Sequence, residues 1–450
     1  MTDALSTDLR ALVEGAAEPV TALEAIDRPR GEQAPMSAEP PSRNGRQRRP
    51  LIARAAAIVV VALLGAGAVV VAATRDDEDR PAEVETAGQR QLAKAVGTWS
   101  EVPTADDLSF AQPPIGVATS DAAYLVGPGQ DGTVTGWAYD PSTGGWSPLP
   151  DTQSTWSAGT QAIAAGERLV VYLGTPSGDQ PSILRYDPAA QRWDALPEPP
   201  GGARSGASIV WTGEQLVLWG GFVGGSPTNI GYALDDGGSA WQELAAAPLA
   251  ARGNHVAVWA GDRMIVWGGC AVDEPPGQCA DIADGTDLVD GASWTPATGQ
   301  WASLPEAPTG PRAAPRVAWD GESVILWGGF LTGDDPVGLA YSTSSNTWQA
   351  LPDGPVSGTG EPVVTAVGDQ VLVLGGTPSD AATRWEQTAT EAALLDVQTG
   401  SWRPIAESPL SPRLYPAVAP IPDTSQVLVW GGLTDPTSGT LAQDGALLSL

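Results

Sequence analysis

The heptapeptide VILWGGF at residues 324–330, with its near copy LVLWGGF at residues 216–222, decides how this chain folds. Each is an apolar run that ends in a glycine pair. The same type of run recurs seven times, and its first glycine stands at Gly127, Gly174, Gly220, Gly268, Gly328, Gly375 and Gly431. The spacings are 47, 46, 48, 60, 47 and 56 residues. A period near fifty residues indicates an array of similar structural units.

A tryptophan signature recurs with the same period, as in GWSPLP and TWQALP. Its seven tryptophans are Trp99, Trp146, Trp193, Trp241, Trp301, Trp348 and Trp402. Six residues before all but the first stands a turn former, namely Asp140, Asp187, Asp235, Thr295, Ser342 and Asp396. Gly-Glu or Gly-Asp pairs also precede most of the apolar runs. These turn signals divide each unit into four short strands.

A unit of four short strands cannot bury both of its faces alone, so the units are expected to stack radially, as in a β-propeller. An apolar run with Gly-Gly, followed some 25 residues later by a tryptophan, resembles the kelch repeat. The resemblance covers residues 96–450 and implies an all-β, seven-bladed, kelch-type propeller with four-stranded blades. The tryptophans that repeat with the blades are interpreted as packing residues.

The repeat register predicts how the ring closes. The last residues, GALLSL at 445–450, align with third strands of the other units, whereas the strand around Trp99 has no preceding partners. We therefore expect the N- and C-terminal strands to complete one blade together, which removes exposed sheet edges. The alternative is six blades with a loose hairpin.

An uncharged segment, residues 55–73, is long enough as a helix to span roughly 28 Å, close to the thickness of a bilayer core. Five arginines precede it from residue 43 onward, and the acidic run DDED follows at 76–79. The positive-inside rule then predicts a single-pass transmembrane helix at 51–74 with a cytoplasmic N-terminus and an extracytoplasmic C-terminal part. A cleaved signal peptide is the alternative.

The rest of the chain follows from this topology. Residues 1–50 are predicted to form a mostly disordered cytoplasmic tail with one short helix, in which residues 1–42 offer a site for a cytoplasmic partner. Residues 75–95 are predicted to form an acidic linker.

The charge of the chain differs between its two parts. Residues 1–75 carry nine Arg and eight acids, whereas residues 76–450 carry fourteen basic and forty-five acidic residues, a net charge of −31. Such a charge excludes nucleic acid as a partner.

Four arginines recur at one place in the repeat. Arg204, Arg252 and Arg312 each stand sixteen residues before a repeat glycine, and Arg413 stands eighteen residues before one. On one mouth of a propeller channel, such a ring would bind carboxylates of peptides or sugars. The other interpretation is that these arginines brace neighbouring blades.

The longest unit carries an insertion with two cysteines and several acids. Cys270 and Cys279 flank a Pro-Pro-Gly turn and are predicted to form a local disulfide, in agreement with an oxidising compartment. A redox or metal role is the alternative. Asp281, Asp284 and Asp287 would suit Ca²⁺, although a solvated acidic loop explains them as well. No other cofactor is expected.

Catalytic patterns are sparse. His255 is the single histidine, which excludes the two-histidine copper site of kelch-bladed radical oxidases and favours a packing role. No GxSxG elbow is present. We therefore expect a binding module for an extracytoplasmic protein or carbohydrate rather than an enzyme. A glycan-active hydrolase that uses channel carboxylates and a transmembrane sensor are the alternatives.

Overall fold

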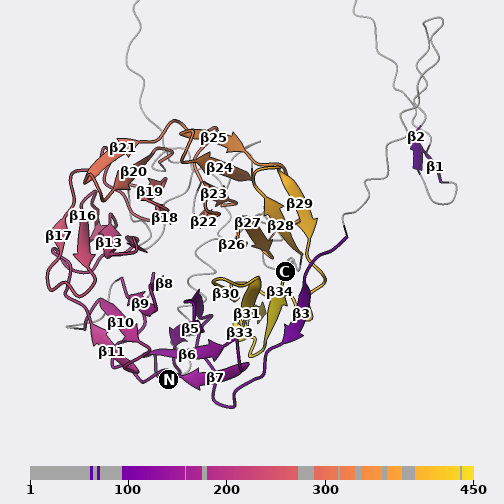
Figure 1. Ribbon diagram of the computed structural model, residues 1–450, viewed down its shortest axis with the longest axis horizontal. Helices are drawn as coiled ribbons and strands as arrows, with labels where there is room; N and C mark the ends of the chain where they lie inside the picture. The colour runs from indigo at the N-terminus through magenta and orange to yellow at the C-terminus, as the bar shows by residue number, and fades with distance from the viewer. Residues whose placement is uncertain are drawn as a thin grey trace, which may run out of the picture. The chain divides into compact units, whose positions relative to one another are not determined.

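The computed structural model describes residues 61–63, 68–70, 94–157, 159–174, 180–271, 288–312, 315–329, 337–356, 362–377, 391–435 and 438–450. All the regular secondary structure in these described residues is β-strand. They fall into two units, residues 1–88 and residues 89–450. The second unit consists of seven four-stranded antiparallel sheets arranged radially, so the predicted seven-bladed all-β propeller is confirmed (Figure 1).

The first strand of each blade lies nearest the axis, and the second strand pairs with it (Figure 1). The first strands are β4 (Ile115–Ala118), β8 (Gln161–Ala165), β12 (Ser208–Trp211), β18 (Val256–Ala260), β22 (Arg316–Trp319), β26 (Val363–Val367) and β30 (Ala417–Ile421). The second strands are β5 (Ala123–Pro128), β9 (Arg168–Tyr172), β13 (Gln215–Trp219), β19 (Arg263–Trp267), β23 (Ser323–Trp327), β27 (Gln370–Leu374) and β31 (Gln426–Trp430). The second strands are the recurring apolar runs, and they are almost wholly buried.

The third and fourth strands continue each blade outward. The third strands are β6 (Val134–Asp140), β10 (Ile183–Asp187), β16 (Gly231–Asp235), β20 (Gly291–Thr295), β24 (Gly338–Ser342), β28 (Ala392–Asp396) and β34 (Gly445–Ser449). The fourth strands are β7 (Gly145–Pro148), β11 (Arg192–Ala195), β17 (Gln242–Glu243), β21 (Gln300–Ser303), β25 (Thr347–Ala350), β29 (Ser401–Pro404) and β3 (Thr98–Glu101). We number the blades 1 to 7 from β4 to β30.

Blade 7 draws its outermost strand from the other end of the chain. β3 pairs with β34 in antiparallel register, with Thr98 opposite Ser449 and Glu101 opposite Ala446. The first strands of neighbouring blades contact each other from β4 through β8, β12, β18, β22, β26 and β30 and back to β4. The N-terminal and C-terminal segments of the propeller therefore contribute strands to the same sheet.

The core lies between the blades. Each pair of neighbouring blades encloses buried apolar side chains, which form two clusters between blades 4 and 5 and one cluster at each other interface. One example joins blades 3 and 4 through Val217 and Trp219 on one side and Met264 and Val266 on the other. Alternate side chains of a strand point to opposite faces, so each second strand contributes to the interfaces on both sides of its blade.

The repeated outer tryptophans link each blade to the one before it. The indole Nε1 of every one donates to the carbonyl oxygen that stands four residues after the preceding repeat tryptophan, at 2.7–3.1 Å. The seven donor and acceptor pairs are Trp99 and Ala406, Trp146 and Pro103, Trp193 and Pro150, Trp241 and Pro197, Trp301 and Ala245, Trp348 and Pro305, and Trp402 and Pro352. One hydrogen bond of this type thus crosses each blade interface.

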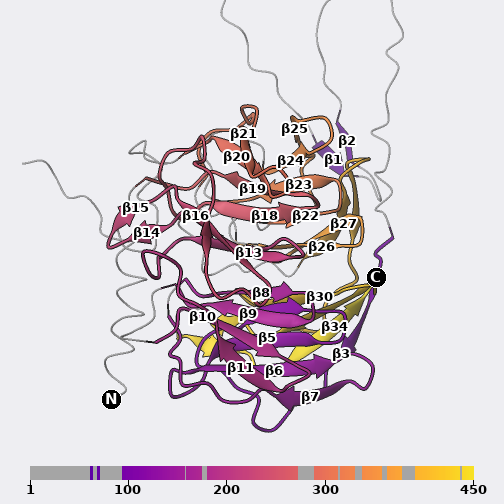
Figure 2. The same cartoon turned by 60° about the vertical axis from the view of Figure 1, so that its left-hand side comes forward.

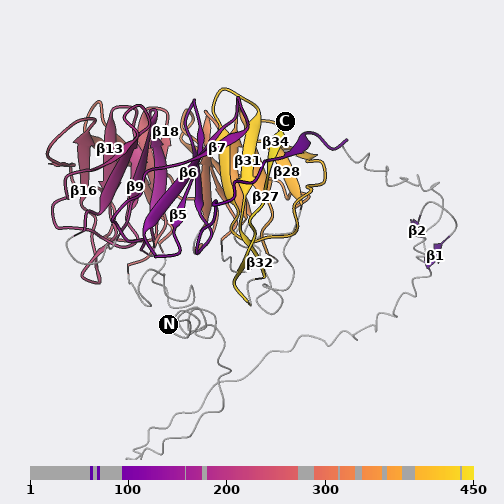
Figure 3. The same cartoon turned by 90° about the horizontal axis from the view of Figure 1, so that it is seen from below.

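The two ends of the propeller differ in their connections. First and second strands are joined by two to four residues, and third and fourth strands by four to six. At the opposite end, the connections between second and third strands range from five to twenty-three residues. We call this end the long-loop face and the other end the short-turn face. Two small hairpins belong to the long-loop face, β14 (Phe222–Val223) with β15 (Ser226–Pro227) and β32 (Leu433–Asp435) with β33 (Thr440–Leu441), and Figures 2 and 3 show where they project.

The N-terminal unit is described only at β1 (Val61–Leu63) and β2 (Ala68–Val70), which pair antiparallel. These six residues belong to the predicted transmembrane helix at 51–74, which stays a prediction. Across the described part of the chain, no helix has the length and apolar character needed to cross a membrane. The tail at 1–50, the rest of 51–74 and the linker at 75–95, except its last two residues, lie outside the described residues.

Candidate functional site

The four repeated arginines all lie at the long-loop face, in the connections that lead from one blade into the next. Nη1 of each donates to two carbonyl oxygens: that of the first glycine after the second strand and that of the residue just before the third strand. These acceptors are Gly220 and Ile230 for Arg204, Gly268 and Asp290 for Arg252, Gly328 and Val337 for Arg312, and Gly431 and Asp444 for Arg413. Each arginine therefore pins the two ends of a second-to-third-strand connection together, and we call this arrangement an arginine bracket.

All four bracket arginines are buried, with between 0% and 6% of the residue exposed. Burial lowers the pKa of Arg252 and of Arg204, since the charged guanidinium loses water contact. Backbone carbonyls compensate for part of that loss. This geometry favours the bracing interpretation of the repeated arginines. Carboxylate binding by the ring of Arg204, Arg252, Arg312 and Arg413 stays a prediction.

Two brackets contain an internal carboxylate. Nη2 of Arg252 lies 2.8 Å from Oδ1 of Asp290 in blade 4, and Nη1 of Arg413 lies 2.8 Å from Oδ1 of Asp444 in blade 7. Each aspartate side chain is 55% exposed, while its arginine is almost wholly buried. The carboxylate therefore sits at the surface and neutralises a cation beneath it.

The glycine pair of blade 3 is required by the close approach of backbone at its bracket. Gly220 has φ +67°, and a Cβ there would lie 2.7 Å from Cε1 of His255 and 3.0 Å from the carbonyl oxygen of Arg252. Gly221 donates its N–H to that same carbonyl at 2.8 Å. Blade 3 and the connection into blade 4 are therefore in direct contact, which any side chain at Gly220 would disrupt.

The single histidine forms a buried pair with a serine that the sequence did not single out. Nε2 of His255 lies 2.8 Å from Oγ of Ser208, and its ring stacks edge-on against Trp219 with centroids 4.9 Å apart. Burial, and then the charge of Arg252, lower the pKa of His255 to about 3. A base this weak takes a proton from a serine poorly. The pair therefore fits the predicted packing role, and the sequence gives no signal that joins Ser208 to His255.

The insertion in blade 4 is described only at its ends. Cys270 is fully buried and bridges Gly253, with N–H to carbonyl distances of 3.0 Å in both directions. Cys279, Asp281, Asp284 and Asp287 lie outside the described residues. In the described part of the propeller, no group of three or more His, Cys, Asp or Glu side chains is placed to hold a metal ion. The disulfide and the Ca²⁺ site stay predictions.

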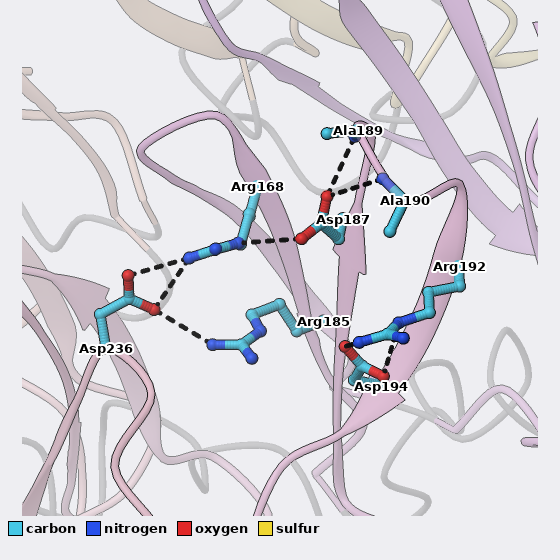
Figure 4. A network of polar contacts seen from close by, with 8 residues as sticks. All are labelled: Arg168, Arg185, Asp187, Ala189, Ala190, Arg192, Asp194 and Asp236. Atoms are coloured by element: carbon cyan, nitrogen blue, oxygen red, sulfur yellow. Dashed lines mark hydrogen bonds and ion pairs between the residues drawn. The ribbon is translucent and has the colours of Figure 1, made fainter.

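The short-turn face carries an ion-pair network between blades 2 and 3 (Figure 4). Asp236 accepts from Nη1 of Arg168 at 2.9 Å and from Nη1 of Arg185 at 3.1 Å. Together with Trp211, these residues line a cleft of about 290 Å³, including the space open to solvent. The space enclosed within it is only about 10 Å³, which is too small for a small-molecule ligand. Because the exposed fractions of Asp236 and Arg168 are 45% and 36%, the network adds only modest stability.

One residue of this network departs from the repeat pattern of the sequence. Asp236 stands where three other blades have Pro141, Pro188 and Pro296, and Arg185 faces it from a neighbouring blade. The two arginines already share an internal carboxylate. The cleft is therefore a weaker candidate site than the long-loop face.

No protein-family model matches the chain, and no curated protein matches it in sequence.

Proposed function

We propose that this protein is a membrane-anchored, extracytoplasmic binding module that holds a protein partner on the long-loop face of a kelch-like propeller. The main support for the proposal is the difference in length between the connections of the propeller. Six of the seven connections that lead from one blade to the next contain twelve residues and the seventh contains thirteen, and the turns of the short-turn face contain six residues or fewer. Only the second-to-third-strand connections vary widely, from five to twenty-three residues.

Variable connections on an otherwise uniform scaffold are typical of a recognition surface. The arginine brackets support this assignment because they fix both ends of four of these connections. Arg252, for example, holds the two ends of a twenty-three-residue connection through Gly268 and Asp290. A loop with fixed ends loses less conformational entropy when a partner binds, so rigid brackets favour affinity.

The chemistry of this face favours a protein over a carbohydrate. Val223 and Ile230 are the two large apolar side chains with high exposure among the residues that the structure describes, at 37% and 41%. Both belong to the connection in blade 3. The seven variable connections together contain fifteen Asp or Glu and one Arg, which disfavours nucleic acid and anionic lipid headgroups.

The membrane anchor is part of the proposal and rests on the sequence. Residues 55–73 carry no charge, arginines precede them and acids follow them. The anchor puts the propeller in the oxidising compartment that a disulfide between Cys270 and Cys279 would require. Asp281, Asp284 and Asp287 would bind Ca²⁺ there. Residues 1–42 would face a cytoplasmic partner.

Co-purification from native membranes tests the proposed function. Tagged full-length protein is compared with two variants that each add one negative charge to an exposed turn: Val223→Asp on the long-loop face and Ser344→Asp on the short-turn face. We expect one protein to be retained at stoichiometric level by the wild type and by Ser344→Asp, and retention by Val223→Asp to fall at least tenfold. Retention that depends on Ser344 instead would place binding on the other face. Recovery of trimmed glycan fragments in place of a protein would contradict the proposal and favour a hydrolase.

A further inference from the structure

Within the described residues, the arginine bracket of blade 3 lacks the carboxylate that the brackets of blades 4 and 7 contain. The side chain just before the third strand is a carboxylate in blade 4, Asp290, and in blade 7, Asp444. In blade 3 the same position is occupied by Ile230, whose carbonyl accepts from Nη1 of Arg204 at 3.0 Å. The backbone arrangement is therefore shared, and only the side chain that would neutralise the arginine is different.

Arg204 has no carboxylate partner among the described residues. Its guanidinium donates to the carbonyls of Gly220, Ile230 and Pro200 and lies over the ring of Tyr232, 5.2 Å from the centroid. Its Nε is buried and has no hydrogen-bond partner. Only 2% of the residue is exposed. A buried cation neutralised only by carbonyls and an aromatic ring is less stable than one paired with a carboxylate.

For Arg312, the presence or absence of a carboxylate partner is not defined by the described residues. Val337 occupies the corresponding position in blade 5, and Nη1 of Arg312 donates to its carbonyl. However, residues 313–314 and 330–336 lie outside the described residues. Blade 3 is therefore the bracket whose surroundings the described residues define without a carboxylate.

The loop beside Arg204 differs from the other variable connections in its composition. Residues 220–230 contain no acid, whereas each of the other six connections contains at least one. This loop instead exposes Val223 and Ile230. Its hairpin is held next to Arg204, because Ser205 and Phe222 exchange backbone hydrogen bonds of 2.8 and 3.2 Å. A cation and two apolar side chains thus lie together on a strongly acidic protein.

We propose that Arg204 binds a carboxylate supplied by a protein partner, in the place that the side chains of Asp290 and Asp444 occupy in their own brackets. The partner group is an acidic side chain flanked by apolar residues that contact Val223 and Ile230. This inference rests on the proposed function and narrows it to one blade. The apolar neighbours favour a peptide over an acidic sugar.

Access to the guanidinium is governed by one short segment. Nη2 of Arg204 donates to the carbonyl of Pro200 at 3.2 Å, the long end of the normal range. Gly201 and Gly202 follow, both with positive φ, and a Cβ at either would meet no atom within 4 Å. The entering carboxylate takes the place of the Pro200 carbonyl, and this glycine segment moves aside with little steric resistance.

A substitution at position 230 tests whether Arg204 is stabilised by a carboxylate. In full-length protein, Ile230→Asp recreates the bracket of blades 4 and 7, and Ile230→Asn is its uncharged control. We expect Tm of Ile230→Asp to exceed that of Ile230→Asn by roughly 2 °C or more, because a buried cation gains a carboxylate. A Tm for Ile230→Asp equal to or below that of the asparagine variant would overturn the proposal.

Added anions then test ligand binding at the same site. Sodium acetate, compared with sodium chloride at equal ionic strength, is expected to raise Tm of the wild type and not that of Ile230→Asp. The converse variant, Asp290→Ile, removes the carboxylate of blade 4 and is expected to gain a second acetate-dependent rise. Equal acetate responses in wild type and Ile230→Asp would contradict the proposal even if one of the variants folded poorly.

A final comparison separates the sources of the carboxylate. Hexanoate is expected to raise Tm of the wild type at lower concentration than glucuronate does, because its chain contacts Val223 and Ile230. A preference for glucuronate would overturn the assignment to a protein partner. These measurements need no partner, so a negative result leaves the co-purification test standing, and a failed co-purification leaves the anion result intact.

Discussion

The indole Nε1 of Trp99 donates to the carbonyl oxygen of Ala406 at 2.9 Å, across 307 residues of sequence. Val96, three residues earlier, exchanges backbone hydrogen bonds of 2.8 and 2.9 Å with Ala406 and Pro404. The first described residues of the propeller therefore contact blade 6, while β3 completes the sheet of blade 7. The strand that follows the linker is bound to two blades at once.

Trp99→Phe should destabilise the propeller as much as the same change in an internal blade. The substitution keeps the aromatic packing and removes one indole hydrogen bond, which we expect to lower the free energy of unfolding by about 1 kcal/mol. The matched control is Trp193→Phe, which loses the bond to Pro150. Urea denaturation measures both. A loss in Trp193→Phe with none in Trp99→Phe would show that β3 is not an integral strand of the ring.

Arg252→Met should be strongly destabilising. It removes the guanidinium donor to the carbonyl of Gly268 and one of two donors to the carbonyl of Asp290, which keeps the N–H of Gly268. It also removes the cation beneath the Asp290 carboxylate. We expect a loss of about 3 kcal/mol in unfolding free energy. Arg192→Met is the control, since the Arg192 side chain is 66% exposed and its loss should change stability by less than about 0.5 kcal/mol. Equal effects of the two changes would contradict the bracket.

Stability should fall with acidification through the buried histidine. The pKa of His255 is lowered to about 3 in the folded state, whereas an unfolded histidine titrates near 6.5. The folded state therefore keeps His255 neutral, and its contribution is fully present above pH ~6.5 and declines as pH falls toward about 3. Between these values the unfolded chain binds one proton more, so unfolding free energy should drop by about 1.4 kcal/mol per pH unit.

The His255→Asn variant separates this effect from the carboxylates. An asparagine side chain does not titrate, so the slope of stability between pH ~6.5 and ~5 should become shallower than in the wild type. Several aspartates, such as Asp140 and Asp187, have pKa values lowered by hydrogen bonds and affect stability only in more acid solution. An unchanged slope in the variant would mean that His255 is not the titrating group.

The two cysteines give a chemical test of the proposed compartment. Protein that is unfolded without reductant should show no reactive thiol, and two should appear after reduction. A disulfide between Cys270 and Cys279 closes a short loop, for which a stabilisation of about 2–3 kcal/mol is expected. Two reactive thiols in protein isolated under oxidising conditions would contradict the pairing.

The repeated features of the fold were predictable because the same residue performs the same task in each blade. Glycine pairs permit positive φ where the second strand ends, as at Gly220 and Gly221, and their spacing gave the blade number. The tryptophan motif also contains the acceptor of the indole hydrogen bond. The acceptor of each indole, Pro150 for Trp193, for example, stands four residues after the preceding tryptophan in the very motif that defines the repeat.

Features specific to one blade could not be predicted. The pairing of His255 with Ser208 joins two blades across 47 residues and has no counterpart that would reveal it by repetition. The burial of the arginines was equally hidden, since sequence spacing places Arg204 in a connection without saying which carbonyls surround it. The sequence alone does not show that Ile230 and Asp290 are equivalent positions. The structure shows this, because the carbonyl of each accepts from the arginine of its own bracket.

Photo-crosslinking in native membranes tests whether the long-loop face binds a partner, with a photoreactive amino acid at Val223 on the long-loop face or at Ser344 on the short-turn face. We predict a cross-link to one protein partner from position 223 and none from position 344. Cross-links from 344 alone, or equally from both positions, would contradict a binding function of the long-loop face.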